Sequence, residues 1–188
     1  PVLLTLAPAA SVLRLLSDLE GATVSFDDQP AGQIQNGEFE LRNVSVGAHT
    51  LEVAGAAGKI AISFETAEAS PPWLRKALEA RGLRALVVAG LGASGRLYSS
   101  VAGEASVDGA AVGTVSPEGL ELKNLADGSH ELVVTGAGNV PHKLVFTADA
   151  SPTVTAFLGS DTRVGALRIQ TSEDAVTSSK YMPKGLIR

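Results

Sequence analysis

The sequence predicts an all-β protein built from two tandem copies of a small antiparallel β-sandwich, with a short helix linking them. Three observations support this prediction: apolar residues alternate with polar ones in short runs, turn residues separate the runs, and one block of sequence returns 81 residues later. Alternation with a period of two is typical of strands that are buried on one face.

The expected strands follow one another along each copy. In the first copy apolar residues alternate at positions 39 and 41, at 51 and 53, and at 60, 62 and 64, and in the second copy at 120 and 122 and at 132 and 134. Turn residues lie between these runs, as in Asp27-Asp28 and Asp108-Gly109. Such residues accept a positive φ or bond their own backbone, so they predict hairpins. Because no helical pattern alternates with the strands, an antiparallel sandwich is favoured over βαβ units.

The repeat itself sets the number of units. Residues 24 to 55 align without a gap with residues 105 to 136, and about a third of the positions are identical. Upstream the spacing becomes 82, so one residue was gained or lost near the first turn, where a β-bulge can absorb it. We expect the following matched positions to hold turns and strands in place: Asp27 and Asp108, Gly32 and Gly113, Asn43 and Asn124, Gly47 and Gly128, His49 and His130.

The repeat also predicts the domain boundaries. We expect a first module at 1–70, a linker at 71–84, a second module at 85–163 and a C-terminal segment at 164–188. Ala85-Leu-Val-Val88 matches Ala166-Leu-Arg-Ile169 at the same spacing. The C-terminal segment is therefore either an extension or the start of a truncated third repeat.

The linker departs from the β pattern. A serine cap, two prolines in the first turn, good helix formers and a closing glycine predict a short helix over residues 70 to 82. The counterpart in the second copy, residues 152 to 158, is β-branched and aromatic and predicts a strand. Since a duplicated framework would favour one structure at both places, a strand at 70 to 82 is the alternative.

Several short motifs recur at the start of each copy and later within it. Leu19-Glu-Gly-Ala-Thr-Val24 precedes Asp27-Asp28, Ala102-Gly-Glu-Ala-Ser-Val107 precedes Asp108-Gly109, and each copy has a later Gly-x-His. With this pattern the unit resembles the PEGA module of bacterial and archaeal surface and signalling proteins, over about residues 20 to 66 and 102 to 147. The first copy keeps three of the four naming letters, whereas the second copy scrambles them.

The resemblance implies a β-sandwich, usually found in tandem or attached to other domains, with no known catalytic residues. It therefore transfers an architecture and no site. A different small sandwich, of the immunoglobulin or carboxypeptidase-regulatory type, is the alternative.

Composition excludes several classes of function. The formal net charge of −5 and the pI near 5.2 argue against nucleic-acid binding, which needs clustered Lys and Arg. Cysteine is absent, so disulfides and thiolate metal sites are excluded. The longest apolar stretch, residues 85 to 93, is much shorter than the roughly 20 residues that span a bilayer, so we expect no transmembrane segment.

The repeated histidines are the most obvious candidates for chemistry, because imidazole is both a metal ligand and a general base. His49 and His130 each follow a turn glycine by two residues, where a histidine can bond across the turn, so we expect a structural role. His142 has no counterpart in the first copy, and no set of three ligands lies at metal-binding spacing. Turns and solvated faces explain the acidic residues, and no serine lies in a nucleophile elbow. We expect no catalytic residue, no metal and no cofactor.

Trp73 is the residue that most suggests a contact with another molecule. It is the only tryptophan and lies in the linker, where it would either fill the junction or anchor a partner subunit. We therefore expect a non-enzymatic structural protein that binds protein partners in a bacterial cell-envelope or surface assembly, located in the periplasm or at the cell surface, where it can associate with a membrane complex. The alternative is a glycan-binding or peptide-binding module of a sensor or transport protein.

Overall fold

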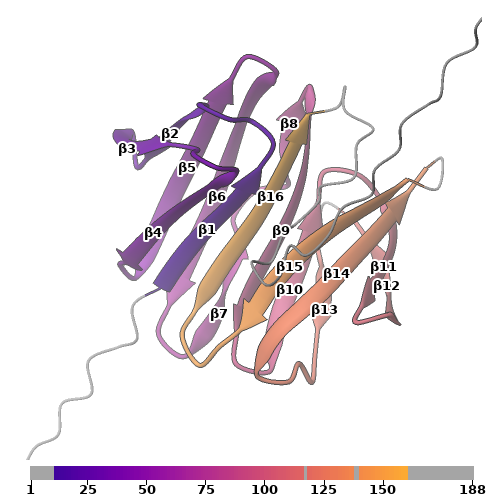
Figure 1. The fold of residues 1–188 in the computed structure, drawn as a ribbon. Coiled ribbons are helices and arrows are strands. Elements are labelled where there is room, and N and C mark those ends of the chain that lie inside the picture. Colours follow the sequence, from indigo (N-terminus) through magenta and orange to yellow (C-terminus); the bar gives the residue numbers. More distant parts are fainter. Residues whose placement is uncertain (1–10, 117, 138–139, 161–188) are drawn as a thin grey trace, which may run out of the picture.

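Strands make up all the regular structure of the described residues (Figure 1). The computed structural model describes residues 11–116, 118–137 and 140–160, without the side chains of residues 79 and 81. The first repeat and the linker contain β1 (Ser11–Ser17), β2 (Thr23–Phe26), β3 (Gln29–Gln33), β4 (Glu38–Val44), β5 (Gly47–Gly55), β6 (Gly58–Ala67), β7 (Ser70–Leu74) and β8 (Glu79–Arg81). The second repeat contains β9 (Leu83–Leu91), β10 (Ser94–Ser99), β11 (Gly103–Val107), β12 (Ala110–Val115), β13 (Leu120–Leu122), β14 (Gly128–Gly136), β15 (Pro141–Ala148) and β16 (Thr153–Ser160).

The strands form three sheets, one of which is shared by the two repeats. The central sheet has the order β13-β10-β9-β16-β1-β4. The first outer sheet, β3-β2-β5-β6-β7 with β8 also paired to β6, belongs to the first repeat and the linker. The second outer sheet, β12-β11-β14-β15, belongs to the second repeat. The prediction of an all-β protein is confirmed, whereas two separate sandwiches are not, because the central sheet takes strands from both repeats.

The outer sheets cover opposite faces of the central sheet, so the fold has three layers. Along β9, Ala85, Val87 and Ala89 belong to one core with residues of the first outer sheet. The alternate residues Leu86 and Val88 belong to a second core with residues of the other outer sheet. Successive side chains of a strand point to opposite faces, so β9 contributes to both cores at once. In Figure 1 the first outer sheet lies behind the central sheet and the second lies in front of it.

The two repeats are related by a half-turn about an axis parallel to the strands. β1 is parallel to β16, which is antiparallel to β9, which is antiparallel to β10, so β1 and β10 run in the same direction. Their matched residues nevertheless face opposite ways, since Leu15 lies in the first core and Leu97 in the second. The cross-strand pairs also match, with Arg14 opposite Glu40 and Arg96 opposite Glu121. The register of the structure thus agrees with the duplication that the sequence predicts.

The predicted linker helix is wrong, because residues 70 to 82 contain strands β7 and β8. β7 is an edge strand whose Leu74 and Trp73 pair with Phe64 and Glu65 of β6. Its prolines are compatible with an edge strand, which does not need every N–H for the ladder. Tertiary pairing with β6 therefore outweighs the local helix propensity. The strand predicted at residues 152 to 158 is confirmed as part of β16.

The predicted domain boundaries are only partly covered by the structure. The first ten residues of the first module and the whole C-terminal segment at 164–188 lie outside the described residues. The proposed third repeat therefore stays a prediction.

Glycines with positive φ begin two matched strands. Gly47 and Gly128 are the first residues of β5 and β14, with φ of 134° and 117°. A Cβ on either glycine would meet no atom within 4 Å, so the constraint is on the backbone alone. Gly136 ends β14 without a positive φ, and a Cβ there would make ordinary contacts, the closest at 3.5 Å.

These two glycines of β14 give a test of the backbone geometry. We expect Gly128→Ala to lower the free energy of unfolding by more than about 1 kcal/mol, because alanine rarely adopts such a φ. Gly136→Ala should change it by less than about 0.5 kcal/mol. Urea denaturation of both variants measures the difference. Equal losses in the two variants would mean that the backbone conformation at Gly128 is not the constraint.

Candidate functional site

The first repeated polar site joins the turn between β2 and β3 to the start of β5. His49 lies with its Nδ1 2.8 Å from Oδ2 of Asp27 and its Nε2 2.8 Å from the carbonyl oxygen of Ser45. The other carboxylate oxygen of Asp27 accepts a hydrogen bond from the backbone N–H of Thr50 at 2.8 Å. We call this arrangement of aspartate, histidine and carbonyl the His-Asp latch.

The second repeat has the same latch. Nδ1 of His130 lies 2.6 Å from Oδ2 of Asp108, and Nε2 lies 2.7 Å from the carbonyl oxygen of Ala126. The backbone N–H of Glu131 donates to Oδ1 of Asp108 at 2.9 Å. Four matched groups (a carboxylate, an imidazole, a backbone carbonyl and a backbone N–H) therefore occupy equivalent places in both repeats, which accounts for the aspartate and histidine that recur in the sequence.

The local backbone explains why an aspartate stands at the turn. Asp27 and Asp28 have φ of 49° and 62°, and Asp108 and Gly109 have φ of 50° and 79°. Two successive residues with positive φ form a type I′ turn, the common two-residue turn of a β-hairpin. Aspartate tolerates this conformation, and its carboxylate is thereby directed across the neighbouring strand to the histidine.

The electrostatics of the second latch favour a charged pair. The hydrogen bond from His130 holds the pKa of Asp108 below its usual value, and so does the N–H of Glu131. The hydrogen bond to Asp108 raises the pKa of His130, and the bond to the Ala126 carbonyl adds to this effect. Both ring nitrogens face acceptors, and only the imidazolium form can donate from both.

The latches hold the fold together and leave little room for chemistry. Each histidine is only 7% exposed, and both of its ring nitrogens are already hydrogen-bonded. In the first repeat the imidazole also stacks on Phe26, with the ring centroids 5.0 Å apart. A general base needs a nitrogen that can reach the substrate, and a nucleophile beside it. Neither latch offers such a nitrogen.

The other matched positions also lie at places of special backbone geometry. Asn43 and Asn124 have φ of 61° and 57°, near the ends of β4 and β13. A Cβ on Gly32 would lie 3.0 Å from the ring of Phe39, and a Cβ on Gly113 would lie 3.3 Å from the side chain of Leu120. These glycines let β3 and β12 approach the following strand closely. The remaining matched residues are turn and strand residues in the structure.

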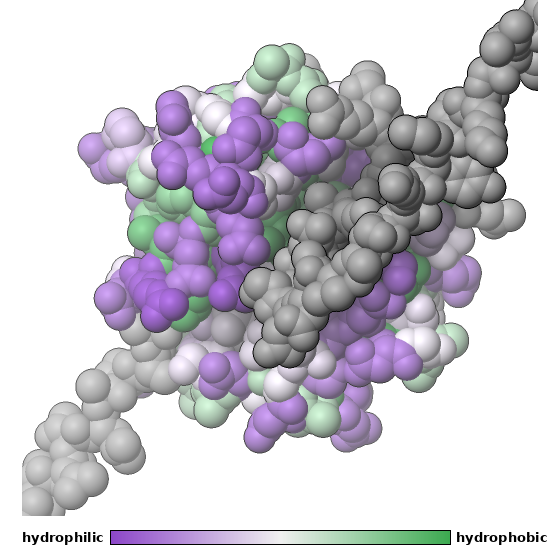
Figure 2. All heavy atoms as spheres, in the orientation of Figure 1, coloured by the Kyte–Doolittle hydropathy of each residue, from purple (hydrophilic) through white to green (hydrophobic). Residues whose placement is uncertain are grey.

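Two acidic residues on the edge strands of the central sheet, Glu40 and Glu121, are paired with cations. Glu40 lies between Arg14, at 3.1 Å, and Arg42, and the hydrogen bond from Arg42 lowers the pKa of Glu40. In the second repeat Lys123 lies 3.1 Å from Glu121. Figure 2 shows hydrophilic residues gathered on the side where β4 lies. These exposed pairs contribute little to stability, but their charges discourage the edges from pairing with other strands.

Trp73 lies on β7 opposite Glu65 and is partly exposed. The neighbouring Leu74 packs against the first core, and its backbone N–H donates to the hydroxyl of Tyr98 at 3.3 Å. Because successive side chains alternate, Trp73 faces away from that core. Its role as an anchor for a partner stays a prediction.

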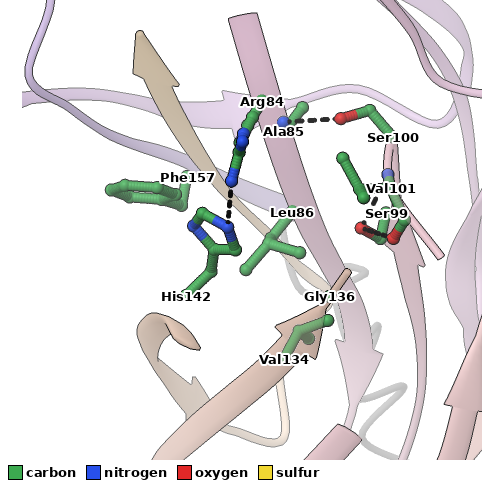
Figure 3. Close-up of a pocket in the computed structure, with 10 residues that line it drawn as sticks. All are labelled: Arg84, Ala85, Leu86, Ser99, Ser100, Val101, Val134, Gly136, His142 and Phe157. Atoms are coloured by element: carbon green, nitrogen blue, oxygen red, sulfur yellow. Dashed lines mark hydrogen bonds between the residues drawn. The ribbon is translucent and has the colours of Figure 1, made fainter. Parts of the chain in front are cut away.

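A small hollow between the central and second outer sheets is the feature that the sequence did not suggest (Figure 3). It measures about 10 Å³, the size of one water molecule. Arg84 of β9 and His142 of β15 meet at its rim, with Nη1 2.7 Å from Nε2. Since a guanidinium only donates, Nε2 of His142 accepts this bond. No motif pairs these two residues in the sequence, because they lie on strands of different sheets.

The described residues offer no assembled metal site and no spanning helix. In the part of the chain that the structure describes, no three His, Asp or Glu side chains converge as metal ligands would. Among the same residues, none belongs to a helix with the length and hydropathy needed to cross a bilayer. In comparisons with known proteins, no family model, no curated protein and no solved structure matches the chain.

The second latch predicts how stability depends on pH. His130 has a raised pKa in the folded state, so its contribution is complete below about pH 6.5 and is lost as the pH rises through the raised value. Asp108 has a lowered pKa, so its contribution is present above about pH 3.9 and is lost as the pH falls through the lowered value. We expect His130→Gln to lower the melting temperature most between these limits and less at alkaline pH.

A double-mutant cycle with Asp108→Asn is the control for this prediction. Thermal denaturation of the two single variants and the double variant should show a coupling between the residues that fades above neutral pH. A coupling that does not change between mildly acidic and alkaline pH would contradict the charged latch.

Proposed function

We propose that the chain is a non-catalytic scaffold or accessory subunit whose duplicated β units bind another protein in a bacterial cell-envelope or surface assembly. The observation that carries the proposal is that, among the described strands, each of the three sheets is open and ends in edge strands. Exposed strand edges pair readily with other chains. The resemblance to PEGA modules supports the extracytoplasmic location, in the periplasm or at the cell surface.

The polar side chains support the same proposal. The two latches bind their histidines within the fold, and Glu40 and Glu121 on the edge strands of the central sheet are paired with cations. No buried side-chain nitrogen or oxygen among the described residues lacks a hydrogen-bond partner. Backbone edges and surface aromatic residues remain available for recognition. The formal charge of −5 does not favour nucleic acid.

One observation favours the second candidate, a glycan-binding or peptide-binding module of a sensor or transport protein. Trp73 is partly exposed on the outer side of β7, beside the carboxylate-bearing Glu65. An indole beside a hydrogen-bond acceptor can stack on an apolar sugar face or hold a peptide side chain. Saturable binding to a glycan array that Trp73→Ala abolishes would select this candidate over the scaffold.

Cross-linking in the native envelope fraction tests the scaffold. We expect one dominant protein adduct, with the cross-linked positions on edge strands or around Trp73. Trp73→Ala should weaken the adduct if the aromatic ring anchors the partner, because such anchors commonly contribute about 2 kcal/mol or more to an interface. Val46→Ala is the matched control, since Val46 is also an exposed apolar residue, at 56%, and lies in the turn before β5. A chain that forms no adduct in its own envelope fraction would contradict the scaffold.

A further inference from the structure

Strand β12 is an edge of the second outer sheet that lacks the charges and prolines that commonly protect an edge, although its pairing with β11 shifts register between Ala105 and Ser106, as at a β-bulge. Its residues Ala110–Val115 carry no charge and no proline, and its first two residues are exposed. Among the described strands, only β11 pairs with it, so its other edge takes part in no described strand pairing. Natural proteins usually place lysine, proline or a short length at such an edge.

The hairpin geometry shows where the unpaired backbone groups of β12 point. Val107 and Ala110 face each other across the two-residue turn of Asp108 and Gly109. The residues that flank such a turn exchange hydrogen bonds with each other. The N–H and C=O of the next residue, Ala111, therefore point away from β11, toward the free side. Ala111 sits opposite Ser106, which agrees with this alternation.

The first repeat has a proline at the same place. Pro30 of β3 lies opposite Ser25, as Ala111 lies opposite Ser106, and both follow a type I′ turn. Proline has no N–H, so the outward position of β3 cannot donate to an added strand, while its own hairpin loses no bond. One of two equivalent edges is thus blocked and the other is available. This difference between otherwise matched strands points to a use for β12.

We propose that β12 pairs in antiparallel fashion with β12 of a second copy of this chain, joining two second outer sheets into one continuous sheet across a two-fold axis. The inference rests on the proposed scaffold function and names one partner for it. An antiparallel pair of identical strands is self-complementary and closes as a dimer. Because β12 is uncharged, the pairing sets no like charges directly opposite each other.

The dimer should be weak and should depend on salt. An edge of six residues contributes much less than the roughly 1,600 Å² of a standard interface. The two chains also repel each other, since each has a formal charge of −5, so added salt should strengthen the association. Weak self-pairing suits a scaffold in which many copies are held close together, because the effective concentration is then high.

Sedimentation velocity over a wide range of concentrations tests the pairing. We expect the full chain to show a reversible monomer-dimer equilibrium, and Ala111→Pro to raise its dissociation constant by at least about tenfold, since one donor is lost from each copy. Ala111→Val is the matched control, because it adds similar bulk but keeps the N–H, and its dimer should resemble that of the unaltered chain. Circular dichroism and the melting temperature should show that Ala111→Pro folds, as the first repeat accepts proline at this place.

The outcomes separate this inference from the proposed function. A chain that stays monomeric at all concentrations and salt levels, or an Ala111→Pro variant that dimerises as well as Ala111→Val, would overturn the β12 pairing. If that chain still forms its adduct in the envelope fraction, the scaffold function stands without it. If Ala111→Pro does not fold, Ala111→Lys replaces it, because a charge on each copy at this edge should also prevent the dimer.

Discussion

The central sheet depends on strands that are buried on both faces. β9 and β16 lie in the middle of this sheet, and each supplies side chains to the cores above and below. A strand in that position needs apolar residues at nearly every place, which its sequence must provide without alternation. The two repeats cannot be separated without exposing these strands. The duplicated sequence therefore yields a single three-layered body of described residues, although each repeat carries its own turns and latch.

The latches stabilise the thin outer parts of this body. Each outer sheet has one face on the central sheet and one face in solvent, and each contains a hairpin that is tied down at its turn by an aspartate and a histidine. With only 4% aromatic residues the cores consist mainly of small aliphatic side chains. Directed hydrogen bonds at the hairpin ends compensate for the modest area that such cores bury. The presence of the same four groups in both repeats follows from this need.

Local sequence was enough to predict strands, turns and the duplication, but not the layer arrangement. The turns at Asp27 and Asp108 were predictable because positive φ restricts the choice of residue. The pairing of each aspartate with a histidine 22 residues later had a signal, since both recur at the same spacing, but it depends on how β5 folds back on β2. The apolar stretch in β9 suits a strand that is buried on both faces, but the identity of its neighbours depends on long-range contacts. For the same reason the helix propensity at residues 70 to 82 gave the wrong structure.

The half-turn that relates the repeats determines how the molecule can present its surfaces. Matched residues of β1 and β10 face opposite sides, and the two outer sheets lie on opposite faces of the central one. A flat partner that lies against one face of the central sheet can therefore touch the outer sheet of only one repeat at a time. The duplication does not double the contact area on that face. It gives the chain two opposed sides, and with them the geometry of a spacer between two neighbours.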